Sequence, residues 1–85
     1  MDDEKLYAID QQGWKLRATI FESKYVPVGC CRYQIEIYVE SVDWWYRLED
    51  NYDAWLWNDA QEHCKERLSW WAKNWRDMPV AKELV

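Results

Sequence analysis

The chain has 85 residues, of which eight are tryptophan and 32% are charged, and its net charge is −5. This length leaves room for one domain over residues 1–85, and the acidic balance argues against non-specific binding to nucleic-acid backbone, which needs clustered Lys and Arg. No apolar run approaches the roughly 18 residues of a membrane span, and the acidic start of the chain is unlike a signal peptide, so we expect a cytoplasmic protein.

Alternation of apolar and polar residues predicts strands within residues 5–57. Residues 14–21 alternate, and residues 32–39 do so more clearly, because Ile and Val suit a pleated surface. Pro27 and Gly29 mark a loop between these two runs. A third alternating run covers residues 42–49, and a turn is expected at Asp50–Asp53. Residues 54–57 fit either a further strand or a backward extension of the helix that follows, and strand is favoured.

From residue 59 the spacing of apolar residues becomes that of a helix, which we expect to reach residue 77. Asn58 is the expected cap, and Pro79 ends the element, leaving residues 79–85 as a loose tail or a short extra turn. One continuous apolar stripe follows from steps of three and four residues: Ala60, Cys64, Leu68, Trp71, Trp75 and Met78.

These elements predict an α+β fold, an antiparallel β-meander of three to five strands with one long C-terminal α-helix packed on one face. The sheet residues expected beneath the helix are Trp14, Leu16, Ile20, Tyr33, Ile35, Ile37, Trp44 and Tyr46.

Because one helix covers one face of a sheet, the opposite face is the candidate interaction surface. Alternation places the rings of Phe21, Tyr38 and Trp45 on it, together with Arg17 and Arg47. Trp, Tyr and Arg are the residues that dominate binding hot spots, so we expect the three rings to anchor a partner and the two arginines to fix its register. Two alternatives are rings that merely pair across strands, and two such faces meeting in a homodimer.

Residues 36–62 contain eight acids and a single basic residue, Arg47. These acids would steer the protein toward a basic partner, or simply form a solvated surface. Trp70, on the helix flank, either borders the binding site or packs locally on Arg67. The full set of predicted partner-binding residues is Phe21, Tyr38, Trp45, Arg17, Arg47, Trp70, Asp43, Glu49, Asp50 and Asp53.

The residues that could carry metal or catalytic chemistry are few. Cys30, Cys31 and Cys64 are odd in number and include an adjacent pair, which argues against a disulfide framework. Structural zinc sites separate paired ligands by two to four residues, and neighbouring helix residues such as His63 and Cys64 point about 100° apart. We therefore predict no metal, no cofactor and no catalytic residue, and we expect the protein not to be an enzyme.

In size, acidity, aromatic density and lack of motifs, the chain resembles small phage- or mobile-element-encoded proteins that bind and block a host protein, anti-CRISPR proteins among them. The resemblance is one of style, and it implies a non-enzymatic inhibitor that occupies a partner's surface. The alternatives are a binder of single-stranded nucleic acid or a small ligand, which would stack on the sheet aromatics, and a structural homodimer.

Overall fold

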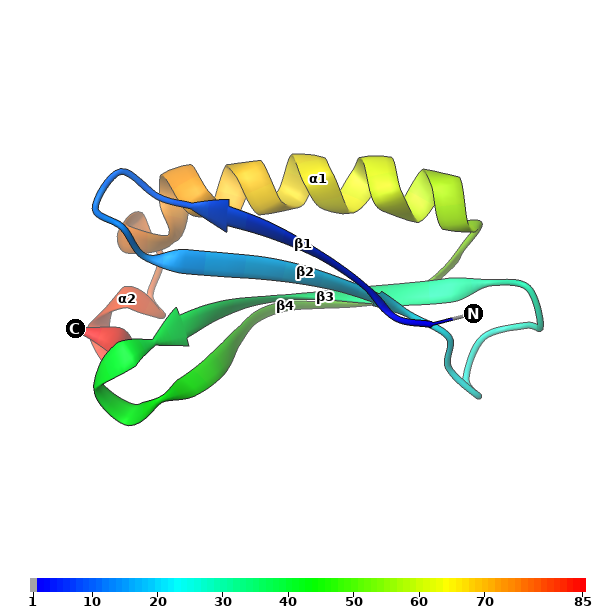
Figure 1. Cartoon of the computed structure of the whole chain (residues 1–85), viewed down its shortest axis with the longest axis horizontal. Coiled ribbons are helices and arrows are strands. Elements are labelled where there is room, and N and C mark those ends of the chain that lie inside the picture. Colours follow the sequence, from blue (N-terminus) through cyan, green and yellow to red (C-terminus); the bar gives the residue numbers. More distant parts are fainter. Residues whose placement is uncertain (1) are drawn as a thin grey trace.

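The computed structural model describes residues 2–85, which form a four-stranded antiparallel sheet with one long helix lying across one face (Figure 1). The strands are β1 (Glu4–Ile9), β2 (Lys15–Phe21), β3 (Cys31–Val39) and β4 (Trp44–Trp55), and the helical segments are η1 (Glu40–Val42), α1 (Trp57–Asn74), η2 (Trp75–Asp77) and α2 (Ala81–Leu84). The order in the sheet is β1-β2-β3-β4, so each strand pairs with its neighbour in sequence. The predicted α+β meander is confirmed.

The turn between β1 and β2 is fixed by one buried carboxylate. Asp10 accepts backbone N–H bonds from Gln12 at 2.9 Å and from Trp14 at 2.8 Å, which is the Asx type of turn. Gly13 completes it with a φ of 88°, a conformation that side chains with a Cβ rarely adopt.

The predicted turn at Asp50–Asp53 is wrong, because β4 runs through these residues without interruption. Asn51 does make a turn-type contact, since its side chain accepts the N–H of Asp53 at 2.9 Å. That contact lies within an irregularity of the β3–β4 pairing, where the register shifts between Cys31 and Tyr33. A β-bulge therefore lies where the sequence predicted a turn, and the strand bends there instead of ending.

The boundaries near the helix also differ from expectation. Of residues 54–57, β4 takes the first two through Trp55 and α1 takes Trp57. Asn58 lies inside the first helical turn, and Leu56 occupies the N-cap position with no side-chain cap. The end of the chain forms the short extra turn α2, whose Ala81 is buried.

The core lies between α1 and the central strands, because the helix packs mainly over β2 and β3. The predicted helix stripe is buried from Ala60 to Trp75, and Met78 is partly buried against the same core. The placement of Trp44 in the core is wrong, since its side chain is 67% exposed. Trp44 opens the edge strand β4, beyond the strands that the helix covers.

Three helix tryptophans tie the helical layer to acids on the sheet side. Each indole N–H donates to a carboxylate oxygen, so a large apolar ring is buried while its one polar atom stays satisfied. The pairs are Trp57 with Glu4 at 3.2 Å, Trp71 with Glu49 at 3.0 Å, and Trp75 with Asp10 at 2.8 Å.

Of the other five tryptophans, Trp55 donates its indole N–H to Asn51 Oδ1 at 2.9 Å. Within residues 2–85, the indole N–H of Trp14, Trp44, Trp45 and Trp70 donates no hydrogen bond to another residue. Trp44 and Trp70 are exposed, and the N–H groups of the partly buried Trp14 and Trp45 are not fully covered, because no fully covered side-chain N or O atom of the buried or partly buried described residues lacks a partner. Surface positions of this kind can offer a ring and a donor to another molecule.

Two of the carboxylates that hold tryptophan have a lowered pKa. Burial raises the pKa of Asp10 and of Glu49, but hydrogen bonds from Trp75 to the first, and from Arg67 and Trp71 to the second, outweigh that effect. Each acid therefore binds its proton more weakly in the folded protein than in the unfolded chain.

Acid is accordingly expected to destabilise the fold. The contribution of both carboxylates is present near neutral pH and is lost as the pH falls below about 5, because the unfolded chain then takes up more protons. Urea denaturation between pH 7 and pH 3 measures this slope. Asp10→Asn should be less stable at pH 7 and show a shallower slope, whereas the control Asp2→Asn, at an exposed position outside the helices and strands, should match wild type. An unchanged acid slope in Asp10→Asn would contradict the assignment.

Candidate functional site: the open face of the sheet

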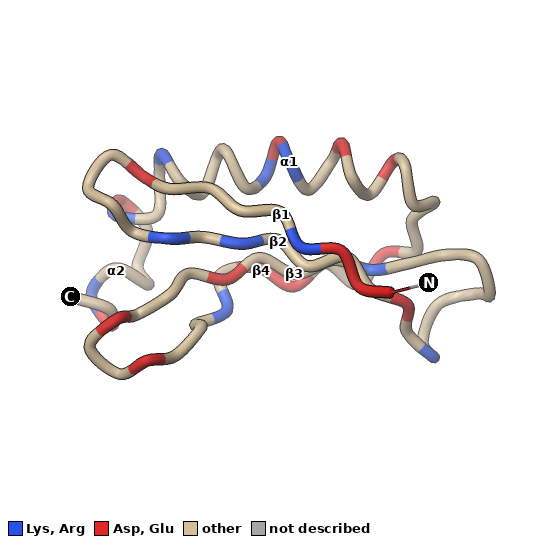
Figure 2. The backbone as a smooth tube through the Cα atoms, in the orientation of Figure 1, with Lys and Arg blue, Asp and Glu red and all other residues tan. Residues whose placement is uncertain are grey.

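The face of the sheet that α1 leaves uncovered, here called the open face, is the candidate site. Its side chains alternate along each strand with those of the buried core. Arg17 lies between the core residues Leu16 and Ala18, and Glu36 lies between Ile35 and Ile37. The face is built from Tyr7, Arg17, Phe21, Arg32, Glu36, Tyr38, Trp45, Arg47, Asp50 and Tyr52. In Figure 2 basic residues follow β2, while acidic residues occupy the β3–β4 connection.

One half of the open face is centred on Trp45 and is named the Trp45 cluster. The Arg17 guanidinium carbon lies 4.0 Å from the centre of the Trp45 ring, and Arg17 Nε donates to Glu36 Oε1 at 2.9 Å. The rings of Tyr38 and Tyr7 lie 5.2 and 6.4 Å from that of Trp45. Three side chains from three neighbouring strands thus hold one indole in place, which lowers the entropy that a partner's binding would cost.

The other half is centred on Arg32 and is named the Arg32 cluster. Arg32 Nη2 donates to Asp50 Oδ1 at 2.9 Å, and its guanidinium carbon lies 4.1 Å from the Tyr52 ring and 5.6 Å from that of Phe21. Arg47 donates to the second oxygen of Asp50 at 3.0 Å. These residues line a shallow depression of about 500 Å³. A side chain of a partner protein could fit into this depression.

Two exposed rings on the open face were not among the predicted residues. Tyr7 is 63% exposed and Tyr52 is 70% exposed, whereas Phe21, Tyr38 and Trp45 are all partly buried. Alternation along residues 6–9 could have found Tyr7. Tyr52 was hidden by the turn expected at its position.

The open face collects six of the predicted site residues: Phe21, Tyr38, Trp45, Arg17, Arg47 and Asp50. Asp43 lies beside it, in the turn after η1 with a φ of 50°, and accepts a hydrogen bond from the Tyr38 hydroxyl. Asp53 is exposed near the end of β4.

Glu49 and Trp70 lie elsewhere. Glu49 is turned toward the helix, where it accepts hydrogen bonds from Arg67, Trp71 and the Tyr33 hydroxyl. Trp70 lies on α1 with its ring 4.7 Å from the Arg67 guanidinium and edge-on to Trp71 at 5.1 Å. Trp70 therefore packs locally on Arg67 and Trp71, and packing on Arg67 was one of the two alternatives predicted for it.

Two of the three cysteines and the histidine are engaged in packing. His63 stacks on Trp55 with ring centres 4.5 Å apart, and Cys31 and Cys64 are fully buried. Burial raises the pKa of Cys31 and raises that of Cys64 to about 11. Among residues 2–85 no group of three or more His, Cys, Asp or Glu side chains is placed to hold a metal ion.

Thiol labelling should therefore distinguish the cysteines. Cys30 is partly exposed, so a thiol reagent at pH 8 is expected to modify it at least about tenfold faster than Cys31 or Cys64, whose thiolates are scarce and covered. Mass spectrometry of the labelled native protein gives the rate at each cysteine, and labelling in denaturant gives the total number of thiols that can react. Rapid modification of all three thiols in the native protein would contradict this core.

No helix within residues 2–85 is both long enough and apolar enough to cross a membrane. Comparison with protein-family models, with curated proteins and with solved structures gives no match for this chain.

Proposed function

We propose that this protein is a small, acidic, non-enzymatic protein-binding module that occupies a partner's surface with its open face. The observation that carries the proposal is the pair of exposed rings, Tyr7 and Tyr52, set on a framework of fixed arginines and carboxylates. Exposed rings flanking partly buried ones give the large, rigid contact area of protein-binding hot spots. In this proposal the protein acts in the cytoplasm and inhibits a host protein by covering its surface, as small phage-encoded inhibitors do.

The charges of the open face favour a protein partner over nucleic acid. Arg17 and Arg32 are both bonded to carboxylates, and their side chains are only 19% and 8% exposed. Arg47 is the arginine of the face with a largely exposed side chain, at 53%. Phosphate binding depends on exposed cations that displace counterions. Lys5 and Lys15 are exposed cations on the β1–β2 side of this face, but the arginines among the rings mainly position those rings.

A basic partner fits the charge of the whole protein. The net charge is −5, and exposed acids such as Glu40 and Asp43 stand beside the Trp45 cluster. Opposite charge speeds encounter and is screened by salt, so capture of the partner should weaken as ionic strength rises.

The test is capture of a protein from nuclease-treated lysate of the source or host cell. The bait Tyr7→Ser/Tyr52→Ser removes the two exposed rings of the open face. The matched bait Trp44→Ser/Leu56→Ser removes two apolar side chains of similar exposure elsewhere, at 67% and 64%. Because all four side chains are largely exposed, both baits should keep the wild-type circular dichroism spectrum.

A protein captured by wild type and the matched bait, but not by Tyr7→Ser/Tyr52→Ser, would support the proposal. Equal capture by all three would exclude the open face as the binding surface. No capture, with a concentration-dependent dimer in sedimentation, would favour the homodimer, and quenching of Trp fluorescence by oligonucleotides would favour the nucleic-acid reading.

A further inference from the structure

We propose a second binding site, separate from the open face: the free edge of β1 together with the groove between β1 and α1, here called the β1 groove. Its occupant is an extended segment of a partner protein with acidic residues four positions apart, which adds to the sheet as a further strand.

The edge of β1 is suited to accept a strand. The sheet order leaves its outer side without a neighbour, and β1 pairs with β2 over six consecutive residues, from Glu4 with Ile20 to Ile9 with Lys15, with no shift in register. The other edge, β4, has two register shifts. Bulges are one of the devices that protect sheet edges from pairing, and β1 lacks one. Its exposed backbone groups can bind an added strand through main-chain hydrogen bonds.

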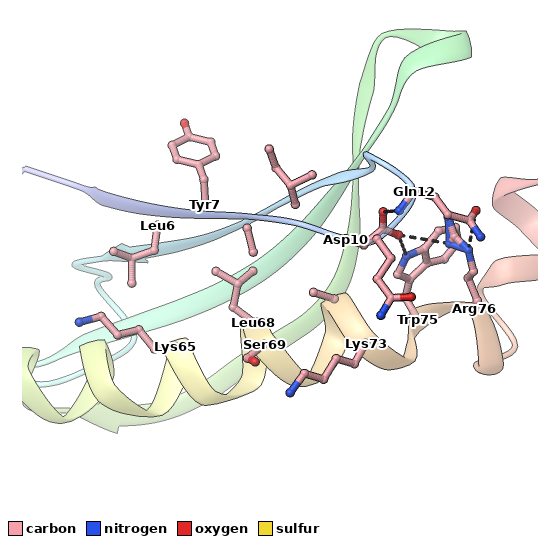
Figure 3. Close-up of a pocket in the computed structure, with 14 residues that line it drawn as sticks. Leu6, Tyr7, Asp10, Gln12, Lys65, Leu68, Ser69, Lys73, Trp75 and Arg76 are labelled. Atoms are coloured by element: carbon pink, nitrogen blue, oxygen red, sulfur yellow. Dashed lines mark hydrogen bonds and ion pairs between the residues drawn. The ribbon is translucent and has the colours of Figure 1, made fainter.

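An apolar groove lies directly beside this edge (Figure 3). Leu6 and Ala8 line it from β1, while Leu68, Ala72 and Trp75 line it from the helical layer, around a space of about 630 Å³. Because side chains alternate along a strand, every second residue of an added strand would point into this groove.

The walls of the groove carry positive charge on the helix side. Lys65 and Lys73 are exposed, line the groove and have no ion-pair partner within residues 2–85. The acid that lines the groove, Asp10, is already bonded to Trp75 at 2.8 Å and to Arg76 at 3.2 Å, and its side chain is 4% exposed. These two ammonium groups make the groove locally positive although the protein as a whole carries −5, so the groove itself favours an acidic occupant.

The spacing of the two lysines determines how far apart the acidic residues of the bound segment should be. Lys65 and Lys73 are eight positions apart in α1, which is about 12 Å along the helix axis. An extended chain advances about 3.4 Å per residue, so it covers the same distance in roughly four residues. Residues i, i+2 and i+4 of a strand share one face. The pattern is an acid at i and i+4, facing Lys65 and Lys73, with an apolar residue at i+2 over Leu68.

The probe is a nine-residue capped peptide, Thr-Thr-Glu-Thr-Val-Thr-Glu-Thr-Thr, titrated into the ¹⁵N-labelled full chain. Shifts are expected in β1 and along the groove face of α1. A control peptide of the same composition, Thr-Thr-Glu-Glu-Val-Thr-Thr-Thr-Thr, points its acids to opposite faces and should bind at least about fivefold more weakly.

Two charge-reversal variants complete the test. Lys65→Glu/Lys73→Glu should weaken binding of the first peptide by about tenfold or more, because attraction becomes repulsion. Lys24→Glu/Lys82→Glu makes the same change in net charge at exposed positions outside the groove and should bind within about twofold of wild type.

Equal binding by the two variants, equal binding of the two peptides, or shifts confined to the Trp45 and Arg32 clusters would each overturn the proposal. A dimer that forms through β1 would overturn it as well, by giving the edge to a second copy. The open-face variant Tyr52→Ser changes a residue of β4 outside the groove, so it should retain binding of the peptide to the β1 groove if the two sites are separate. Failure of one proposal therefore leaves the other measurable.

Discussion

Trp75→Ala is expected to lower the free energy of unfolding by about 3–5 kcal/mol, the largest loss for any single side chain of this protein. Trp75 is 1% exposed, its ring lies 4.8 Å from that of Trp14, and its N–H donates to Asp10. The substitution leaves a cavity between helix and sheet and removes a hydrogen bond to a buried carboxylate. A domain of this size is stable by only about 5–10 kcal/mol, so the variant should be at the limit of folding. Urea denaturation followed by circular dichroism measures the change.

Two matched variants separate the causes of that loss. Trp44→Ala removes the same side chain where it is 67% exposed, and its effect should stay within about 0.5 kcal/mol. Trp75→Phe keeps most of the buried ring but removes the N–H donor, and its loss in the free energy of unfolding should lie between those of Trp75→Ala and Trp44→Ala. Similar losses for Trp75→Ala and Trp44→Ala would contradict the placement of Trp75 in the core and of Trp44 on the surface.

Glu49→Ala should cost about 2–3 kcal/mol, because it leaves several partly buried donors without their acceptor. Glu49 accepts from Arg67 Nε at 2.9 Å, from Trp71 Nε1 at 3.0 Å and from the Tyr33 hydroxyl at 3.2 Å. The Arg67 side chain is 33% exposed, so water recovers part of the loss on that side. Chemical denaturation at pH 7 measures the effect.

Glu62→Ala is the control, since Glu62 is an exposed acid on the same protein that the hydrogen bonds of Glu49 do not involve. Its effect should stay within about 0.5 kcal/mol. If Glu49→Ala were as mild as Glu62→Ala, the carboxylate would be surface charge, one of the two alternatives that the sequence left open for these acids, and the helix–sheet network would carry little stability.

The fold was predictable where the signal is local. The steps of three and four residues from Ala60 to Trp75 can place one face of a helix in a core, and the period of two through Ile35 and Ile37 can do the same for a strand. Both segments are buried as expected. Because β-meanders pair neighbours in sequence, the order of the strands also followed from short connections.

The open face was predictable for the same reason, and the errors cluster in β4. Alternation from Trp45 through Arg47 placed Glu49 on the open face. The register shift between Ile35 and Glu36 turns it to the helix side instead. One extra residue in a strand reverses the side on which every later residue lies, and no local sequence pattern marked this bulge.

Trp44 and Trp70 show what composition alone leaves undecided. Trp44 was predicted in the core and is 67% exposed, whereas Trp70 was predicted on the helix flank and is 37% exposed. The exposure of the two rings depends on which strands the helix covers, and that is decided only when helix and sheet pack together. The acids that accept indole N–H groups likewise come from distant parts of the chain, as with Glu4 and Trp57.

The central claim is that the open face binds a protein partner, with the Trp45 ring beside those of Tyr7 and Tyr38 in the contact. It is tested most directly by the affinity of the captured partner for two variants. Trp45→Ala should weaken binding by about 2 kcal/mol or more, which is roughly 30-fold, while Trp44→Ala should change it less than about threefold. Isothermal titration calorimetry gives both values, on proteins whose folds are verified by circular dichroism. An unchanged affinity for Trp45→Ala, or equal losses for the two variants, would contradict the claim.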